Sequence, residues 1–328
     1  MADARCKTSF GFAIGAFAAI LAAAPLGAQP YPNKPLRLII PFPGAGGGAD
    51  FVGRVAGVKL SEGLGQPVVI ENRPGAAGNI GLELGAKAQP DGYTVVIAPP
   101  SLTISPSLYK KLGYDPVKDL APISLLAEIP NLLTIRQTIP ANTLKEFVDY
   151  ARASPGKLNF GTSGIGTSVH LATVLFMHQT GIDMVHVTYK GSSQALVAMI
   201  GNEVDLVVLG PTSALPHIKA GRVKALAVMR DTRLAALPQV PTLKEAGVEN
   251  SEVITWYGLL APAGTPREIV RRLNAEWVKA AATPDTREKM AVAGVEVLTS
   301  SPEQFADMIR KEIPRWGKVV RDANIKIE

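Results

Sequence analysis

A cluster of glycines near residue 45 is the first feature of this sequence that suggests chemistry. An apolar run, Leu36–Ile40, predicts a buried strand before the cluster, and apolar residues recur at helical spacing from Val52 onward. Glycine lets a ligand approach the main chain closely, and the first N–H groups of a helix are unpaired and partly positive. Strand, loop and helix therefore predict a carboxylate or phosphate pocket. The candidate binding residues here are Gly44, Gly46, Gly47, Gly48, Ala49 and Asp50.

A second loop of the same kind lies in the middle of the chain. Residues 161–168 are rich in glycine, serine and threonine, between a predicted strand at 158–160 and a predicted helix at 169–179. Facing the first loop across a cleft, it would hold a solute's carboxylates from the other side. Residues 189–193, before a predicted helix at 194–200, form a third candidate. The plain alternative for each loop is an ordinary strand-to-helix turn. The candidates from these two loops are Thr162, Ser163, Gly164, Thr167, Ser168, Tyr189 and Lys190.

Asp50 has two interpretations. Its carboxylate either complements the positive end of the helix that begins there, or it receives the ammonium group of an amino-acid ligand. A carboxylate at this position would repel a ligand carboxylate placed beside it. The structural interpretation is therefore favoured, and Asp50 is kept as a candidate.

The first loop also satisfies a dinucleotide-binding pattern, G-x-G-x-x-G/A, through Gly44, Gly46 and Ala49. The acidic residue that would hold a ribose is Glu71, which lies farther along the chain than the usual distance of about 20 residues. Predicted export also argues against a nicotinamide cofactor. We therefore expect no cofactor.

Hydrolase and metal chemistry have weaker signals. Ser168 and His170 could act as nucleophile and base of an exported carboxylic-ester hydrolase. Neither glycine–serine segment of this loop, however, has the final glycine of the G-x-S-x-G elbow. The histidines show no spacing typical of a metal site. We expect no catalytic residue and no metal, and we keep the ester hydrolase as an alternative. The four histidines are His170, His178, His186 and His217.

The N-terminal residues 1–28 predict a secretory signal peptide. Arg5 and Lys7 precede an uncharged apolar stretch at 10–26, and two small residues follow that end at Ala28. We predict cleavage after Ala28, with Ala24 as the alternative position. An uncleaved membrane anchor is the other interpretation, although the stretch is short for a span of about 20 residues. A periplasmic location is expected.

Composition limits the possible functions further. The chain has 328 residues, of which 47% are hydrophobic and 19% charged, and this predicts a globular protein of two domains. The formal net charge is +6, but the basic residues are scattered, whereas nucleic-acid-binding proteins concentrate them. We therefore expect no nucleic-acid partner. The only cysteine, Cys6, lies in the predicted signal peptide, so the mature chain is predicted to lack disulfides.

Predicted strands and helices alternate along the chain, which indicates parallel sheets with helical crossovers. Residues 99–122, rich in proline and polar turns, predict a long surface excursion. The C-terminal part is predicted to return to the first domain, because the strand at 253–261 otherwise has no sheet to join. Further strands are predicted at 67–71, 93–98, 132–135, 184–187, 205–209 and 224–229, and further helices at 79–88, 143–152, 266–282, 284–293 and 302–323.

Several motifs, in order over the whole mature chain, resemble the Bug family, the substrate-binding receptors of tripartite tricarboxylate transporters. The chain departs from the family at Ala49, where members often have serine or threonine before the aspartate. The motifs are Tyr31-Pro32-x-Lys34-Pro35-x-Arg37, Pro41-Phe42 before the glycine loop, Asp50-x-x-x-Arg54 after it, Glu71-Asn72-Arg73-Pro74-Gly75-Ala76-x-Gly78, Pro90-Asp91-Gly92-Tyr93, Tyr189-Lys190-Gly191 and Ala261-Pro262-x-Gly264-Thr265-Pro266.

The resemblance implies a type II periplasmic-binding-protein fold, with two α/β domains that close on a ligand. Residues 29–131 and 256–328 would form domain 1, residues 132–255 would form domain 2, and 132–135 and 253–257 would cross between them. Ligand carboxylates would be held by main-chain amides of the first two glycine loops, and Phe42 would pack on the ligand's carbon frame.

The implied function is an extracytoplasmic receptor, without enzymatic activity, that captures a small carboxylate-bearing solute for a tripartite tricarboxylate-type permease. An exported sensory receptor for the same solutes is the alternative. A monomer is expected. The identity of the solute stays open, because recognition by the main chain leaves little trace in the side chains.

Overall fold

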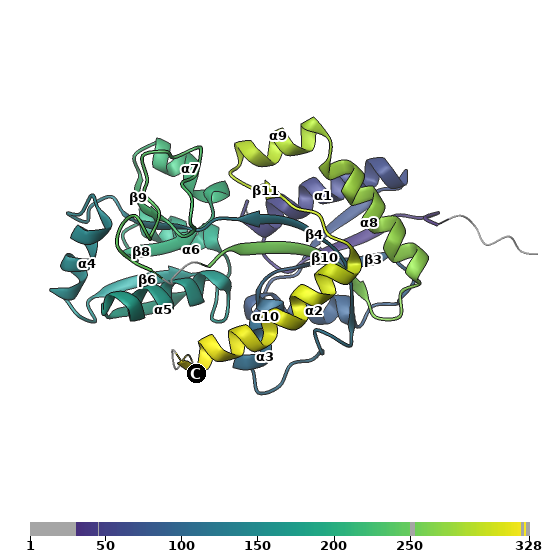
Figure 1. Ribbon diagram of the computed structural model, residues 1–328, viewed down its shortest axis with the longest axis horizontal. Helices are drawn as coiled ribbons and strands as arrows, with labels where there is room; N and C mark the ends of the chain where they lie inside the picture. The colour runs from purple at the N-terminus through teal and green to yellow at the C-terminus, as the bar shows by residue number, and fades with distance from the viewer. Residues whose placement is uncertain (1–30, 45, 250–252, 323–324, 326–328) are drawn as a thin grey trace, which may run out of the picture. The chain divides into compact units, whose positions relative to one another are not determined.

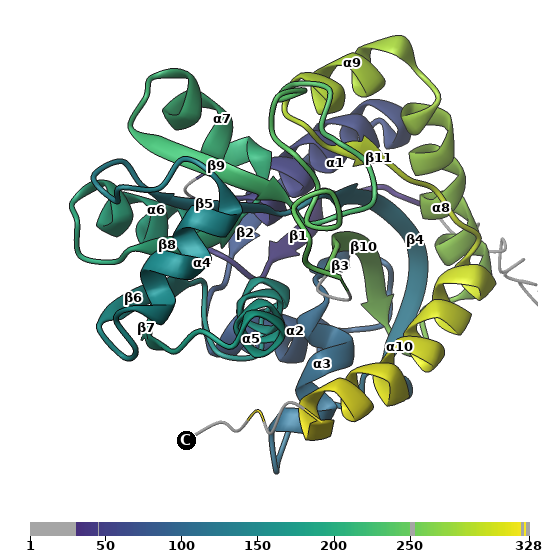
Figure 2. The ribbon, with the colours of Figure 1, turned by 60° about the vertical axis from the view of Figure 1, so that its left-hand side comes forward.

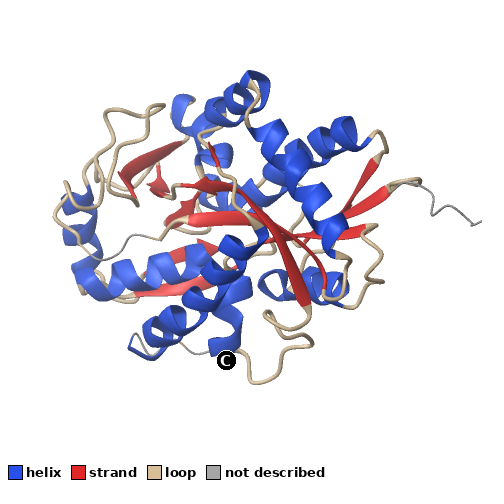
Figure 3. Cartoon of the chain, turned by 45° about the vertical axis from the view of Figure 1, so that its right-hand side comes forward, coloured by secondary structure: helices blue, strands red, loops and turns tan. Residues whose placement is uncertain are grey.

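Two β-sheets, each flanked by helices, organise this computed structural model (Figures 1 and 3). It describes residues 31–44, 46–249, 253–322 and 325, all within one unit, Tyr31–Glu328; the predicted signal peptide lies outside the described residues. The strands are β1 (Leu36–Ile40), β2 (Val68–Asn72), β3 (Thr94–Ala98), β4 (Leu120–Ile129), β5 (Leu132–Arg136), β6 (Leu158–Thr162), β7 (Met184–Thr188), β8 (Leu206–Leu209), β9 (Val223–Val228), β10 (Thr255–Pro262) and β11 (Glu296–Val297). The helices are α1 (Gly48–Leu64), η1 (Ala76–Gly78), α2 (Asn79–Ala86), α3 (Ser101–Leu108), α4 (Leu144–Arg152), α5 (Ser168–Thr180), α6 (Ser192–Ile200), α7 (Pro211–Lys219), α8 (Arg267–Ala281), α9 (Pro284–Val292) and α10 (Pro302–Asp322).

The first sheet has the strand order β11-β4-β10-β3-β1-β2. Strand β1 pairs in parallel with β2 and β3, while β10 runs antiparallel to β3 and β4. Leu38, Ile39 and Ile40 of β1 are fully buried, as is typical of a strand covered by helices on both faces. Because β1 and β3 are parallel, the loops that follow them leave the same edge of the sheet, where α1 and α3 begin.

The second sheet has the order β7-β6-β8-β5-β9. Strand β6 is parallel to β7 and β8, and β5 is antiparallel to β8 and β9. The loops after β6, β7 and β8 lead into α5, α6 and α7, so these three helices begin at one edge of this sheet. Helix α7 was not predicted from the sequence, although Gly210 and Pro211 form a typical helix start.

The chain passes between the sheets at two places. It leaves β4 at Ile129 and enters β5 at Leu132, and it later enters β10 at Thr255. The family resemblance implied crossing strands at 132–135 and 253–257, and this is wrong in part. Residues 132–135 lie in β5, within the second sheet, and Thr255–Tyr257 already belong to the ladder of the first sheet.

The surface excursion predicted for residues 99–122 is wrong in part, because it agrees only with residues 109–119, which lack a helix or strand and are largely exposed. The predicted segment also contains α3, whose residues 101–105 are buried, and it leads into the ten-residue strand β4. Pro122 obscured β4 in the sequence, because proline cannot donate to a strand ladder. In the structure Pro122 lies opposite Leu260, beside a register irregularity, where a missing donor is tolerated.

The predicted return of the C-terminal part to the first sheet is confirmed for β10, which lies between β3 and β4. Helix α10 then runs along β4 toward α3 (Figure 2). Its residues Phe305 and Ile309 belong to an apolar cluster of the first sheet, whereas Trp316 belongs to a cluster that contains Phe176 of α5. No helix among the described residues has both the length and the apolar character that a membrane span needs.

The start of α4 illustrates how local sequence positions a helix. Thr143 is the N-cap and accepts a hydrogen bond from the Glu146 N–H, while the Glu146 carboxylate accepts one from the Asn142 N–H at 2.7 Å. We expect Thr143→Ala to lower the free energy of unfolding by about 1 kcal/mol, since a first-turn N–H loses its partner. Urea unfolding measures this change. Thr143→Ser is the control and should behave like the wild type; equal midpoints for Ala and Ser would contradict the prediction.

Candidate functional site

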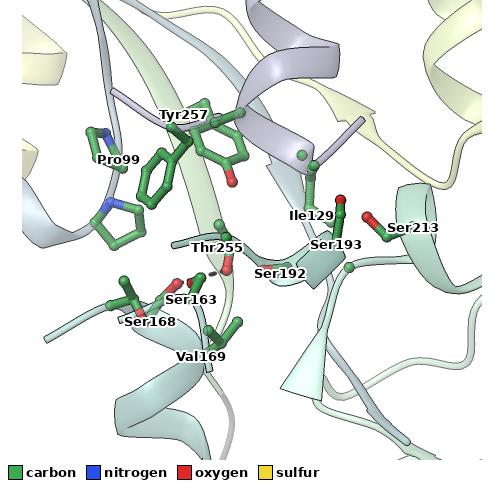
Figure 4. A pocket seen from close by; sticks show the side chains of 18 of the residues that line it. Pro99, Ile129, Ser163, Ser168, Val169, Ser192, Ser193, Ser213, Thr255 and Tyr257 are labelled. Carbon is green, nitrogen blue, oxygen red and sulfur yellow. Dashed lines mark hydrogen bonds between the residues drawn. The ribbon is translucent and has the colours of Figure 1, made fainter. Parts of the chain in front are cut away.

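A pocket lies where the N-termini of five helices meet the two connections between the sheets (Figure 4). Helices α1 and α3 approach it from the first sheet, and α5, α6 and α7 approach it from the second. Asn131 and Thr255, at the two connections, also line it. The lining residues from the helix starts are Gly47, Gly48 and Ala49 of α1, Pro99, Pro100 and Ser101 of α3, Thr167, Ser168 and Val169 of α5, Gly191, Ser192, Ser193 and Gln194 of α6, and Gly210 and Ser213 of α7.

The electrostatic character of the pocket comes from the main chain. Among the described residues that line it there is no Asp, Glu, Lys, Arg or His. The first N–H groups of each helix have no partner within the helix, and they carry roughly half a positive charge together. The lining hydroxyls and amides add further neutral donors. The pocket therefore suits an anion without presenting a cationic side chain.

The first glycine loop brings its main chain close to the pocket. Gly46 has a φ of +74°, which favours glycine, and its carbonyl accepts a hydrogen bond from Ser213 Oγ at 3.3 Å. A Cβ on Gly48 would lie 3.1 Å from the Tyr257 hydroxyl, so this position has no room for a side chain. The Ala49 N–H donates to the Tyr257 hydroxyl, and burial raises the pKa of that phenol, which therefore stays neutral.

Asp50 lies outside the pocket lining. Its buried carboxylate accepts hydrogen bonds from Arg54 Nε at 2.9 Å and from Asn72 Nδ2 at 3.0 Å. Asn72 Nδ2 also donates to the Phe42 carbonyl at 2.9 Å, and a Cβ on Gly44 would lie 2.9 Å from Asn72 Oδ1. The structural interpretation of Asp50 agrees with these contacts, which hold the loop in place from behind.

The second glycine loop presents Ser163, Thr167 and Ser168 to the pocket. Thr167 is the N-cap of α5 and accepts from the His170 N–H, while its own hydroxyl donates to the Gly164 carbonyl at 2.8 Å. Gly164 has a φ of +127°, so the turn needs glycine. Thr162 and Gly164 are not pocket residues; they support the turn.

Two histidines lie beneath this loop. His186 Nε2 is 2.7 Å from the Thr162 hydroxyl oxygen, and His170 Nδ1 accepts from the Gly166 N–H at 3.3 Å. The two imidazoles stack with ring centroids 4.6 Å apart, and His186 stacks on Phe160 at 4.7 Å. Burial, with His186 nearby, lowers the pKa of His170 to about 3, and burial lowers the pKa of His186 to about 4. Both rings are therefore neutral at physiological pH.

Ser168 and His170 do not form the nucleophile pair that the sequence left open. The Ser168 hydroxyl oxygen lies 2.8 Å from the Thr255 hydroxyl oxygen, and the His170 ring instead accepts from the main chain of its own loop. Among the described residues, the hydrogen-bond partner of the Ser168 hydroxyl is therefore another hydroxyl and not a base.

The third candidate loop is placed correctly, but the residues chosen from it are not in the lining. Tyr189 packs against the apolar cluster behind the pocket, and its N–H donates to the Thr162 carbonyl at 2.9 Å. The Lys190 N–H donates to Gln194 Oε1 at 3.1 Å. The next four residues, 191–194, line the pocket instead. The signal that pointed to them was the Gly-Ser-Ser sequence, which forms the N-cap and first two residues of α6.

Of the candidate residues, seven lie together in the pocket and seven lie behind or beside it. Those in the lining are Phe42, Gly47, Gly48, Ala49, Ser163, Thr167 and Ser168; those outside it are Gly44, Gly46, Asp50, Thr162, Gly164, Tyr189 and Lys190. The starts of α3 and α7 were missed, although each follows a buried strand directly, with Pro99-Pro100 or Gly210-Pro211 at the junction.

In the described part of the chain, few features support the binding of a nicotinamide cofactor or a metal ion. Glu71, the residue that could hold a ribose, forms ion pairs with Arg37 and Arg73, and hydrogen bonding from Arg37 lowers its pKa. No group of three or more His, Cys, Asp or Glu residues is placed to hold a metal ion within the described ranges.

The model of the tripartite tricarboxylate transporter family receptor matches residues 52–325. A protein from the tcbD–tcbE intergenic region of Pseudomonas sp. strain P51 is 39% identical over 291 residues, which cover 88% of this chain and 86% of the relative. Protein BugT of Bordetella pertussis is 34% identical over 308 residues, which cover 93% of this chain and 94% of BugT.

Solved structures show the same fold. The periplasmic binding protein BugD has a TM-score of 0.87 at 34% identity, covering 91% of this chain and 100% of BugD. Rpa4515 of R. palustris with adipate has a TM-score of 0.87 at 35% identity, covering 90% and 99%. MatC from Rhodopseudomonas palustris with bound malate has a TM-score of 0.84 at 33% identity, covering 88% and 100%. The predicted fold, that of the periplasmic binding proteins, is therefore confirmed.

Proposed function

Because the chain belongs to the tripartite tricarboxylate transporter receptor family, we propose that it captures a small carboxylate-bearing solute in the pocket between its two sheets. The observation that carries this proposal is the convergence of five helix N-termini on a pocket whose described lining has no charged side chain. Main-chain N–H groups and hydroxyls stabilise an anion in such a place. Two relatives with the same fold hold dicarboxylates, adipate and malate.

The proposed ligand contacts come from both sheets. The amides of Gly47 and Gly48 and the hydroxyls of Ser163 and Ser168 would bind carboxylate oxygens. The Ala49 N–H and the Thr167 hydroxyl already donate within the protein, to Tyr257 and to the Gly164 carbonyl. Apolar walls lie beside these donors and would cover the carbon frame of the ligand. The walls are formed by Phe42, Pro43, Pro99, Pro100, Ile129 and Val169.

The proposed domains are residues 29–131 with 256–328, and residues 132–255. Each would contain one sheet, and the connections at Asn131 and Thr255 would act as the hinge. Contacts across the cleft support closure on a ligand: Ser213 donates to the Gly46 carbonyl, and a Cβ on Gly191 would lie 3.3 Å from Pro43.

We further propose that the receptor is periplasmic, exported by a signal peptide cleaved after Ala28, and that it acts as a monomer without enzymatic activity. The relative BugD is a periplasmic binding protein. The membrane subunits of a tripartite tricarboxylate transporter would be its partners, as the family description suggests.

A thermal-shift screen of the mature protein tests this function. At a concentration about 100 times its Kd, a ligand adds about 2.7 kcal/mol to the free energy of unfolding. We expect malate, adipate or a related acid to raise Tm by several degrees. The diamides of the same acids are the control and should leave Tm unchanged, because they lack the negative charge. Failure of every mono-, di- and tricarboxylate to shift Tm would contradict the proposal.

A further inference from the structure

The pocket contains a chain of hydrogen bonds that joins the anion loop to both connections between the sheets. Ser168, the first residue of α5, lies with its Oγ 2.8 Å from Thr255 Oγ1 (Figure 4, dashed line). Thr255 Oγ1 donates to Asn131 Oδ1 at 3.2 Å, and Asn131 Nδ2 donates to the Val253 carbonyl at 2.6 Å. Ser168, Thr255 and Asn131 all line the pocket, and all three are buried.

The direction of each bond in this chain follows from the supply of donors. Asn131 directs an N–H of its amide nitrogen at a carbonyl, so its oxygen faces Thr255 as an acceptor. A threonine hydroxyl has one proton, and Thr255 gives it to that oxygen. In the contact between the two hydroxyls, Ser168 must therefore be the donor and Thr255 the acceptor.

This direction has a consequence for a carboxylate in the pocket. A carboxylate only accepts hydrogen bonds, and the single hydroxyl proton of Ser168 is already directed at Thr255. To use that proton, the ligand has to draw it away from Thr255 Oγ1. The Ser168–Thr255 bond therefore competes with the ligand for the same proton.

We propose that Thr255 and Asn131 are positioning residues that set the carboxylate affinity of the pocket by holding the hydroxyl of Ser168. The inference rests on the proposed function, which it deepens. Because Thr255 begins β10 and Asn131 follows β4, the exchange of partners by Ser168 occurs where the two sheets are joined. Ligand binding thereby changes a hydrogen bond between the second sheet's α5 and the proposed hinge.

Thr255→Val tests the inference, because valine keeps the shape of threonine and removes the acceptor. Isothermal titration uses the acid that stabilises the wild type most in the screen. We expect Kd to fall about fivefold, because the ligand no longer has to break the Ser168–Thr255 hydrogen bond. A fivefold change corresponds to the net free energy of one hydrogen bond. Ser168→Ala should raise Kd about fivefold, and the double variant should bind like Ser168→Ala alone. Thr255→Ser, which keeps the hydroxyl, should retain the wild-type Kd.

Each result has a clear meaning. An unchanged or higher Kd for Thr255→Val overturns the inference. A lower Kd also overturns it if Thr255→Val lowers the Kd of the Ser168→Ala variant as well. The inference is likewise overturned if Thr255→Ser lowers Kd as much as Thr255→Val does. Thr255→Ala supplies the same test if the valine variant does not fold by circular dichroism. If the wild type binds an acid and the Thr255 variants bind it with the same Kd, the inference is overturned but the proposed function is not. Binding of no acid by the wild type overturns the proposed function and the inference with it.

Discussion

Replacing Ser163 by aspartate is expected to abolish carboxylate binding, with an increase in Kd of about a thousandfold. Ser163 lines the pocket in the loop between β6 and α5, directly after Thr162, and is 9% exposed. An aspartate there places a fixed negative charge where the ligand's charge is proposed to bind. Two like charges about 4 Å apart repel by about 4 kcal/mol at an effective dielectric constant of 20, which corresponds to about three decades in Kd. Isothermal titration with the best acid of the screen measures the loss.

Ser163→Asn is the matched control, because asparagine has the shape of aspartate without its charge. We expect the asparagine variant to bind within about tenfold of the wild type, since any remaining loss reflects size alone. Circular dichroism checks that both variants are folded. If aspartate and asparagine weaken binding equally, the pocket does not recognise an anion at this loop.

Acidification is expected to destabilise the protein between about pH 6.5 and pH 4 by several kcal/mol. His170 and His186 have pKa values of about 3 and about 4 in the folded protein, well below the 6.5 of an exposed histidine. Over this range the unfolded chain binds more protons than the folded one. The free energy of unfolding is therefore highest above pH 6.5 and falls as the pH falls toward the folded pKa values. The fall is up to about 1.4 kcal/mol per pH unit for His170, and it is smaller for His186, which is partly exposed and so screened by solvent.

Urea unfolding at half-unit pH steps measures this slope, and phenylalanine variants identify its source. His170→Phe and His186→Phe keep an aromatic ring in the stack but remove the titrating group. Each should lower stability at pH 7, because Gly166 or Thr162 loses its partner, and each should flatten the slope between pH 6.5 and pH 4. Glu128 acts in the opposite direction, since burial and Glu296 raise its pKa. A slope that survives both substitutions would show that the histidines are not its source.

Features that depend on neighbouring residues were predicted well from the sequence. The strand β1, the glycine loop and the start of α1 follow from apolar spacing and glycine content within some twenty residues. The second loop before α5 and the capped start of α4 are equally local. The family motifs are also short segments, and membership is confirmed by the match over residues 52–325.

The weaker predictions concern residues whose role depends on distant partners. Lys190 follows a correctly placed strand, but the pocket is lined by the four residues after it. Strand β4 was missed because its proline is tolerated only opposite an irregular part of β10, which a local pattern cannot reveal. Asp50 could not be separated from a ligand-binding carboxylate until Asn72 and Arg54 were seen beside it.

By itself the sequence determined the class of this protein: alternating strands and helices, two glycine loops at helix starts, and the motifs of a solute receptor. Only the tertiary structure decided which atoms line the pocket. Asn131 and Thr255 are 124 residues apart in the chain yet share a hydrogen bond there, and His170 stacks on His186 from a different element. The reason is physical: helix starts and turns are set by neighbouring residues, whereas a binding pocket is set by the packing of segments that meet only when both sheets have formed.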